Sequence, residues 1–437
     1  MPNRGMIRRS VAGVVLVLML TLAACAPAPS PTPAPSPLPT LTSTADASTP
    51  VPTVSAPNPL VVTLTLWVPD LFSPYGDGLA AEVLAQQMDA FAQAYPDLQV
   101  RVVTKKAEGR GGLLDFLRTA SVAAPSVLPD LVILSTADLQ LATQAGLLQP
   151  LDPFLREGLA ADRFPFATAL GQVGEQTMGV VLGAEMMHLA YRPDLLPDPP
   201  ITWTDVISAP APFLFPISGP GGDVTDAFLC QYIASGGDLL DEAGAPTLDV
   251  MLLGDQLLFY QRAVAAGVIS PTVVAALADT AATWEQFQAE QAALAVVNSH
   301  QFWSVRDPDL APAPFPTRIG HSVTIAEGWV VALVAADPTR QSQAMTFVEW
   351  LLAPENLGAW TQSVAYLPST LSALEEWDVT EAERATLEVL LEGAMPPIDP
   401  ALRAEVGPPL QAALAAVLEG RRTPAEAARI AVEAVRQ

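Results

Sequence analysis

From residue 60 to residue 146, short apolar strands alternate with amphipathic helices, and this alternation limits the possible folds more than any other feature. The segment "LVVTLTLWVP" is β-branched and apolar and predicts a buried strand. A helical pattern follows it, with one apolar face at Leu84, Met88, Phe91 and Tyr95. "LQVRVV" and "PDLVILS" predict two more strands, and "DLQLATQAG" predicts a helix that ends at Gly146. Strands that alternate with helices indicate βαβ units and a mostly parallel sheet.

Ligands of such sheets bind outside the carboxyl ends of the strands, because those ends and the helix N-termini lie close together there. Trp67 and its successors up to Asp70 follow the first predicted strand, and Ser135 to Asp138 follow the third. We therefore take Trp67, Ser135 and Asp138 as candidate ligand contacts.

The rest of the chain keeps this mixed pattern. "VMLLGDQLLFYQRAVAAG" predicts a long helix, and "GWVVALVA" predicts a strand. "ATWEQFQAEQAALAVVNSHQFWS" predicts a helix, a strand and then a loop that carries Phe302 and Trp303. A final helix begins after Thr423, with Pro424 at its first position and Glu426 where a capping box needs it. With 437 residues, 50% of them hydrophobic, the chain is long enough for two lobes.

Residues 1–24 have the composition of a secretory signal peptide. Arg4, Arg8 and Arg9 form a basic start, an apolar run follows, and "LAAC" ends at Cys25. Small residues before a cysteine resemble a bacterial lipobox, which implies cleavage before Cys25 and lipidation of its thiol. An ordinary signal peptide followed by an unrelated cysteine is the alternative.

The segment 25–59 begins with that cysteine and is otherwise rich in Pro, Ser, Thr and Ala. This composition cannot bury a core and predicts a disordered, extended linker. Next to a lipid anchor, such a linker would hold a folded domain away from the membrane. Recognition of the prolines by a partner is the other interpretation.

The chain is strongly acidic, with a formal net charge of −25. Cleavage would remove three of the 21 basic residues and leave 18 against 46 acids, a net charge of −28. Such a surface repels nucleic acid and anionic lipid headgroups, so neither is an expected partner. With Cys25 lipidated, Cys230 has no partner for a disulfide, and its apolar surroundings predict a small core residue.

Five segments, in this order, resemble family 1 of the extracellular solute-binding proteins, the receptors of ABC importers that include maltose-binding protein. They are "YPDLQV" with "PDLVILSTADLQLATQAGLLQPLD", "GAEMMHLAYRPDLLPDPPITWTDV", "AALAVVNSHQFWS", "AMTFVEWLLAPENLGAWTQ" with "YLPS", and "RRTPAEAARIAVEAV". The resemblance extends over nearly all of residues 60–437. It implies an α/β, two-lobed periplasmic-binding-protein-like fold (type II) that closes around a solute between lobes joined by crossing strands.

The resemblance also implies a division of the chain. The first lobe would comprise residues 60–182 and about 322–368, and the second would comprise 183–321 and about 369–437. The expected protein is a monomer outside the cytoplasm, held to the membrane by its lipid anchor, that delivers its solute to an ABC permease.

The resemblance assigns site residues as well. Glu185 matches a family glutamate that accepts hydrogen bonds from sugar hydroxyls where strands cross between the lobes. Trp303 matches an aromatic residue of the second lobe's cleft loop, but Gln301 stands where sugar-binding members place a stacking tryptophan. Trp329 and Tyr366 are further candidates, because sugar rings stack on aromatic side chains. A neutral polyhydroxylated solute, a sugar or an oligosaccharide, is the expected ligand.

No cofactor or metal site is expected, because the three histidines are far apart in the sequence. An importer receptor catalyses nothing. The alternatives are a receptor for a non-sugar solute, a secreted glycosidase that uses paired carboxylates, and a surface adhesin that reuses the fold. Neither Gly-x-Ser-x-Gly nor His-Glu-x-x-His occurs in the chain to support an enzyme.

Overall fold

The computed structural model describes residues 61–155, 162–209, 211–219, 222–289 and 292–437. The predicted signal peptide, Cys25 and the predicted linker therefore lie outside the described residues. The first expected elements are confirmed, in the order β1 (Val62–Val68), α1 (Leu79–Ala94), β2 (Leu98–Thr104), α2 (Leu113–Ala123), β3 (Leu131–Ser135) and α3 (Thr136–Gln144).

One large mixed sheet organises the chain, with the strand order β2-β1-β3-β10-β6-β8-β7. β1 is parallel to β2 and β3, as the alternating pattern predicted, and β7 (Phe213–Leu214) is parallel to β8 (Leu294–Asn298). β10 (Thr324–Leu333) lies antiparallel between β3 and β6 (Val180–Tyr191). The expectation of a mostly parallel sheet is therefore wrong at the centre, because β10 runs opposite to both of its neighbours, β3 and β6, and β8 also runs opposite to β6.

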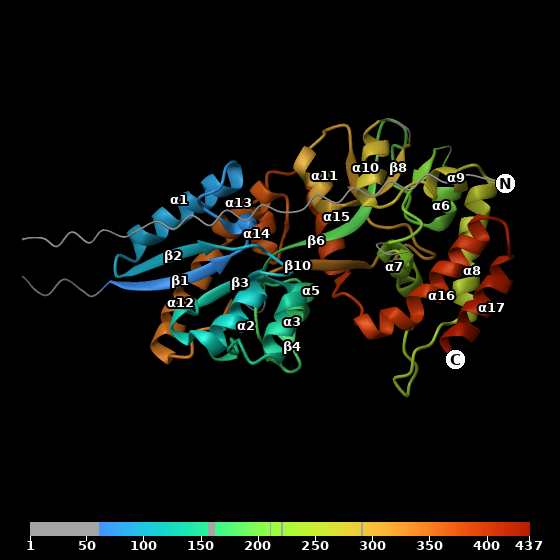
Figure 1. The fold of residues 1–437 in the computed structure, drawn as a ribbon. Coiled ribbons are helices and arrows are strands. Elements are labelled where there is room, and N and C mark those ends of the chain that lie inside the picture. Colours follow the sequence, from blue (N-terminus) through green and yellow to red (C-terminus); the bar gives the residue numbers. More distant parts are fainter. Residues whose placement is uncertain (1–60, 156–161, 210, 220–221, 290–291) are drawn as a thin grey trace, which may run out of the picture. The chain divides into compact units, whose positions relative to one another are not determined.

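β6 and β10 lie side by side through the middle of the sheet (Figure 1). The first half of β6 pairs with β10 from Val180 to Met186. Its second half, from Met187 to Tyr191, pairs with β8 and also with β9 (Ala311–Ala313). A single strand of 12 residues thus joins the part of the sheet around β1–β3 to the part around β7–β9.

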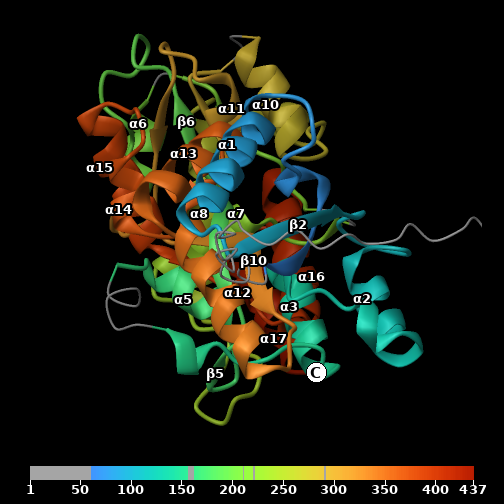
Figure 2. The same cartoon turned by 90° about the vertical axis from the view of Figure 1, so that its left-hand side faces the viewer.

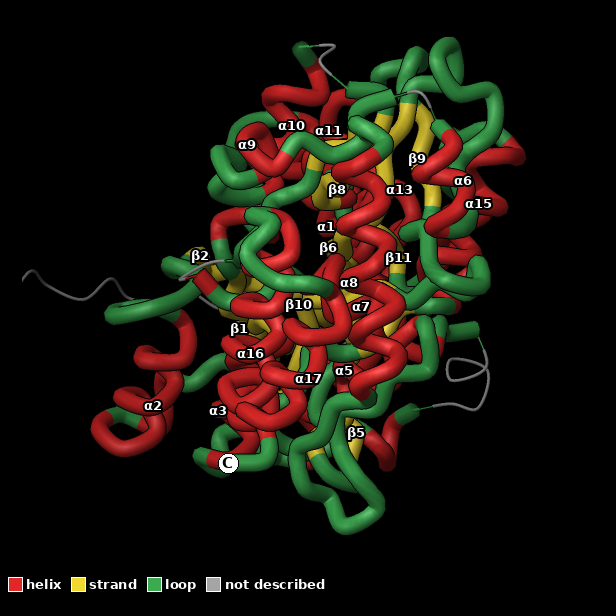
Figure 3. The backbone as a smooth tube through the Cα atoms, turned by 90° about the vertical axis from the view of Figure 1, so that its right-hand side faces the viewer, coloured by secondary structure: helices red, strands yellow, loops and turns green. Residues whose placement is uncertain are grey.

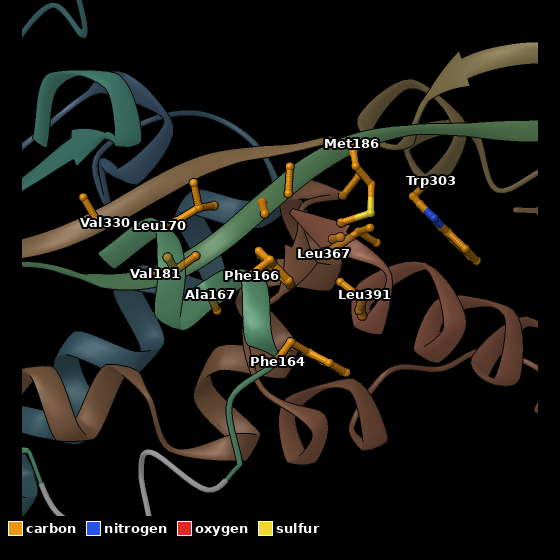
Figure 4. Close-up of a cluster of buried hydrophobic side chains, with 14 of the residues drawn as sticks. Phe164, Phe166, Ala167, Leu170, Val181, Met186, Trp303, Val330, Leu367 and Leu391 are labelled. Carbon is orange, nitrogen blue, oxygen red and sulfur yellow. The ribbon is translucent and has the colours of Figure 1, made fainter. Parts of the chain in front are cut away.

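The buried side chains form three clusters. One lies under α1, α12 (Pro338–Leu351) and α13 (Pro354–Val364) and includes Phe91 and Phe347 (Figure 2). A second lies among α7 (Asp226–Ala234), α8 (Val250–Ala265), α16 (Pro400–Leu418) and α17 (Pro424–Val435) (Figure 3). Cys230 belongs to it and is 1% exposed, which confirms the prediction of a core residue. The third cluster packs against the middle of β6 (Figure 4).

The structure differs from two local predictions. Ser299–Val305 forms a helix, α11, where a loop was expected, because Asn298 caps its N-terminus through a hydrogen bond from the His300 N–H. The capping box at Thr423 is only half formed: its hydroxyl accepts from the Glu426 N–H, but the Glu426 carboxylate accepts from Arg422 instead.

The remaining elements are short or peripheral. They are η1 (Asp70–Phe72), η2 (Pro125–Val127), η3 (Asp152–Phe154), α5 (Pro165–Gly171), β4 (Gln172–Val173), β5 (Gln176–Thr177), α6 (Trp203–Ser208), α9 (Pro271–Val274), α10 (Thr280–Gln288), β11 (Leu367–Pro368), α14 (Leu371–Glu375), α15 (Glu381–Glu392) and β12 (Ala394–Met395). Among the described residues, no helix has both the length and the apolar character needed to cross a bilayer.

Candidate functional site

Two carboxylates stand directly opposite each other on the central strands. Glu185 of β6 is the register partner of Glu327 of β10. Side chains paired in this way leave the same face of the sheet, with Cβ atoms roughly 5 Å apart. Like charges at such a position destabilise a sheet, so the pair is unfavourable for folding alone.

The surroundings of Glu327 strengthen this conflict. Removal of water by the surrounding protein is the largest cause that raises the pKa of the Glu327 carboxyl. The charges of Asp226 and Glu185 raise it further, Arg403 opposes them, and Glu108 adds a smaller rise. Glu327 nevertheless keeps an exposed surface, so a solute can reach it.

Aromatic side chains adjoin the two carboxylates. Trp329 lies two residues after Glu327 and therefore on the same face of β10. Tyr366 is close enough for the Glu185 charge to raise the pKa of its phenol, although burial is the larger cause, and the Trp329 indole donates a hydrogen bond to that phenol. We call Glu185, Glu327, Trp329 and Tyr366 the carboxylate–aromatic face.

Two more rings hold this face in place. The Phe72 ring meets the Trp329 ring edge-on at 5.9 Å between centroids. On the other side, the His300 ring lies 5.0 Å from the Tyr366 ring. Both aromatic residues of the face are thus fixed by neighbours and remain only partly buried.

The end of β3 brings two predicted residues beside this face. Ser135 is the register partner of Trp329, and its hydroxyl caps α3 by accepting from the Asp138 N–H at 3.2 Å. Burial, followed by the charge of Glu108, raises the pKa of the Asp138 carboxyl. Ser135 and Asp138 therefore lie where the sequence placed them, at the carboxyl end of a strand.

Trp67 is 6% exposed, and its environment differs from that of Trp329. The Lys105 ammonium lies 4.5 Å from the centroid of the Trp67 ring and 4.0 Å from that of Phe116. One face of Trp67 is thus occupied by a cation of the protein itself. A solute contact through Trp67 stays a prediction.

Trp303 is buried in the central cluster, 5% exposed, and lies near Met186 and Leu367 (Figure 4). Its ring meets the Trp377 ring edge-on at 5.7 Å. Gln301, on the same helix, is half-buried, and its side-chain oxygen has no partner among the described residues. The Trp303 indole nitrogen is likewise buried without a partner among the described residues. A solute role for these two residues stays a prediction.

Sequence reasoning missed Glu327 and Lys105 as neighbours of the site, whereas it allowed that His300 could reach the cleft. Glu327 was missed because the strand was predicted to begin at Gly328, four residues after its start at Thr324. In the structure, buried and more exposed residues alternate from Ala326 to Val330, which places a second acid on the strand.

Arg403 is the cation whose charge acts on Glu327, and its donors are already engaged. Its guanidinium binds Asp223 at 2.7 Å, Asp226 at 2.5 Å and the Val224 carbonyl at 2.7 Å. The clamp joins α16 to the start of α7. Within the part of the chain that the structure describes, neither Glu185 nor Glu327 forms an ion pair. No group of three or more metal-binding side chains occurs within the described parts of the chain.

The face can therefore accept hydrogen bonds through two carboxylates and stack a ring on aromatic side chains. This is the chemistry of reversible recognition.

Several solved structures with this fold are named as sugar- or solute-binding proteins. A cyclic alpha-maltosyl-1,6-maltose binding protein from Arthrobacter globiformis superposes with a TM-score of 0.65 at 20% identity, covering 86% of this chain and 98% of its own. The sugar-binding protein MalE from Xanthomonas citri gives 0.64 at 18% identity, with 86% and 96% covered. A family 1 extracellular solute-binding protein from Alicyclobacillus acidocaldarius gives 0.65 at 18%, with 86% and 98% covered.

At these identities the likeness shows the fold, and it confirms the two-lobed α/β class expected from the sequence. None of the curated proteins matches this chain. The model of one family, described as bacterial extracellular solute-binding protein, matches residues 86–386. That match extends over more than half of the 437 residues, so the chain belongs to the bacterial extracellular solute-binding protein family.

Proposed function

We propose that this protein is the membrane-anchored receptor of an ABC importer and that it binds a neutral polyhydroxylated solute, a sugar or an oligosaccharide, at the carboxylate–aromatic face. The observation that carries the proposal is the pairing of Glu185 and Glu327 beside Trp329 and Tyr366. Vicinal hydroxyls donate to carboxylates, and the apolar face of a sugar ring stacks on an aromatic side chain. Two similar structures, from A. globiformis and X. citri, are named as maltosyl-maltose- and sugar-binding proteins.

In this proposal the lobes follow the division expected from the sequence, and β6 and β10 are strands that cross between them. Closure of the lobes over the solute would present a shape that the permease recognises. The receptor acts as a monomer and catalyses no reaction.

Thermal shift measurements against a panel of sugars, polyols, amino acids and polyamines test the ligand. A sugar or oligosaccharide is expected to raise the melting temperature, because a ligand that binds only the folded state stabilises it. A shift by amino acids alone would contradict the sugar assignment and leave the receptor class intact. Hydrolysis of any glycoside in the panel by the purified protein would contradict the non-enzymatic role.

A cationic solute is a second candidate, and one observation favours it. Among the described residues neither Glu185 nor Glu327 forms an ion pair, and an ammonium group on the solute would supply a counter-ion. Shifts produced by polyamines and not by neutral sugars would select this alternative.

The anchor is tested separately. If Cys25 carries lipid, Cys25→Ser should leave the protein in the soluble fraction of lysed cells, whereas the wild type sediments with membranes. Membrane association that persists in the variant would contradict the lipid anchor. The solute assignment does not depend on this outcome.

A further inference from the structure

Four positions form a square on the carboxylate–aromatic face. Glu185 is opposite Glu327, and Gly183, two residues earlier on β6, is opposite Trp329. Residues two apart on a strand point to the same face, so all four positions belong to one surface. Three of them carry large side chains. The fourth, Gly183, carries none.

Tyr366 occupies the space above that glycine. A Cβ built on Gly183 would lie 3.1 Å from the Tyr366 Cβ, 3.4 Å from the Thr361 methyl and 3.5 Å from the Trp360 ring. The nearest of these is a Cβ, which cannot turn away as the end of a long side chain can. A methyl group at position 183 therefore requires the Tyr366 Cβ to give way by a few tenths of an ångström, away from β6.

The place of Tyr366 matters because its ring meets three parts of the site there. Its phenol accepts from the Trp329 indole and is close to the Glu185 charge. Its ring touches the His300 ring of α11. Ala365, just before it, has a left-handed backbone with φ of 58°, which a residue with a side chain adopts at a cost. Tyr366 is thus preceded by a strained residue, Ala365, and packs over a residue without a side chain, Gly183.

We propose that Gly183 is a positioning residue: by leaving its corner of the square empty, it seats Tyr366 beside Glu185 and Trp329, so that the site selects ring-shaped sugars over open-chain polyols. The ligand part of this inference rests on the proposed function. A ring has an apolar face that stacks on a fixed aromatic side chain, whereas a flexible polyol has none and loses more conformational freedom on binding. Gly183 acts through Tyr366 and does not touch the solute.

The binding test uses maltose and maltitol, which differ by the opening of one ring. Calorimetry should show that the wild type binds maltose about tenfold more tightly than maltitol. Gly183→Ala should lose both the affinity and the preference, as should Tyr366→Ala. The double variant should bind no more weakly than Tyr366→Ala, since both changes remove the same contact. Independent, additive losses would overturn the inference, as would an unchanged preference in Gly183→Ala.

A ligand-free measurement separates this inference from the proposed function. The ultraviolet absorbance of the Tyr366 phenolate, taken as the difference between a protein and its Tyr366→Phe form, reports the phenol pKa. Burial raises that pKa above its usual value in the wild type. Gly183→Ala should bring it back toward 10, because the displaced ring regains water.

An unchanged phenol pKa overturns the positioning role whatever the sugars do. A wild type that binds neither probe contradicts the ring preference for maltose over maltitol, whereas the wider panel decides the proposed function. A lowered phenol pKa in Gly183→Ala would then still support the position of Tyr366 beside Glu185.

Two further variants serve as controls, one in case Gly183→Ala does not fold and one for the effect of adding a methyl group at a glycine elsewhere. If Gly183→Ala does not fold, Gly183→Ala with Thr361→Ser removes the methyl 3.4 Å away and keeps the hydroxyl that accepts from Trp377. The Tyr366 Cβ still blocks the new methyl, so the same shifts are expected. Gly254→Ala is the matched control. Gly254 lies inside α8, and a Cβ added there would meet only Ala428 of α17, at 4.0 Å, so neither measurement should change.

Discussion

Glu185 and Glu327 face each other as register partners of β6 and β10, and both are acids. A sequence optimised only for stability would place opposite charges or a polar neutral pair there. Such unfavourable pairs occur at binding sites, because the side chains there are selected to complement a ligand and not to stabilise each other.

The first prediction concerns Glu327→Gln and pH. The pKa of Glu327 is raised in the folded protein, so its contribution to stability is full at acid pH and is lost as the pH rises through the folded pKa. Removing the charge should therefore raise the melting temperature at pH 8 relative to the wild type, with a smaller gain at pH 4. Melting curves at the two pH values measure this. An equal gain at both would show that repulsion is not the cause.

The second prediction concerns Glu185→Gln and solute affinity. If the carboxylate accepts hydroxyls of the bound solute, its loss should weaken binding by about 1–3 kcal/mol. Calorimetry with the solute selected by the thermal-shift panel measures the change. Glu285→Gln, at an exposed position of α10, is the control and should bind as the wild type does. Unchanged affinity in Glu185→Gln would remove this residue from the site.

The third prediction concerns a structural ion pair. Asp130 is 5% exposed and accepts from Arg340 Nε and Nη2, each at 2.6 Å, and from the Thr65 N–H at 2.7 Å. Arg340→Met leaves the carboxylate buried without its cation and should lower the free energy of unfolding by about 2–3 kcal/mol. The cost stays below that of a fully buried pair, because the Arg340 side chain is 40% exposed.

Urea unfolding measures this change. Arg429→Met, which breaks an exposed pair with Glu433, is the control and should cost less than about 1 kcal/mol. Equal losses in the two variants would show that burial of Asp130 adds nothing.

The fourth prediction concerns His188. Burial lowers its pKa from 6.5 to about 4, and its ring packs edge-on against Phe302. A base with a lowered folded pKa contributes stability that is present above 6.5 and is lost as the pH falls toward 4. The wild type should lose up to about 3 kcal/mol in this window, and His188→Gln should lose less. Urea unfolding across this pH range measures it, with the exposed His321→Gln as the control that keeps the wild-type slope.

Local pattern was enough to find most of the strands and helices. A few consecutive residues are enough to recognise the apolar runs of β1 and β3 and the single apolar face of α1. The reason is that the direction in which successive side chains point depends only on the local backbone conformation. The same holds for Cys230, whose apolar neighbours predicted its burial. The environment of Trp303 did not follow from its neighbours in the sequence. The segment after Asn298 is a helix where a loop was predicted, and the Trp303 ring is buried in the core.

By itself, the sequence determined the α/β class and the residues that end β3, since each follows from a short pattern of polarity. The strand that bears Glu185 was expected from the family resemblance instead. Only the tertiary structure decided which residues meet. The register of β6 against β10 set Glu327 opposite Glu185 and Trp329 opposite Gly183 across more than 140 residues of chain. It also placed Tyr366 over that glycine. Such pairings depend on the packing of distant segments, and no local pattern along the chain contains them.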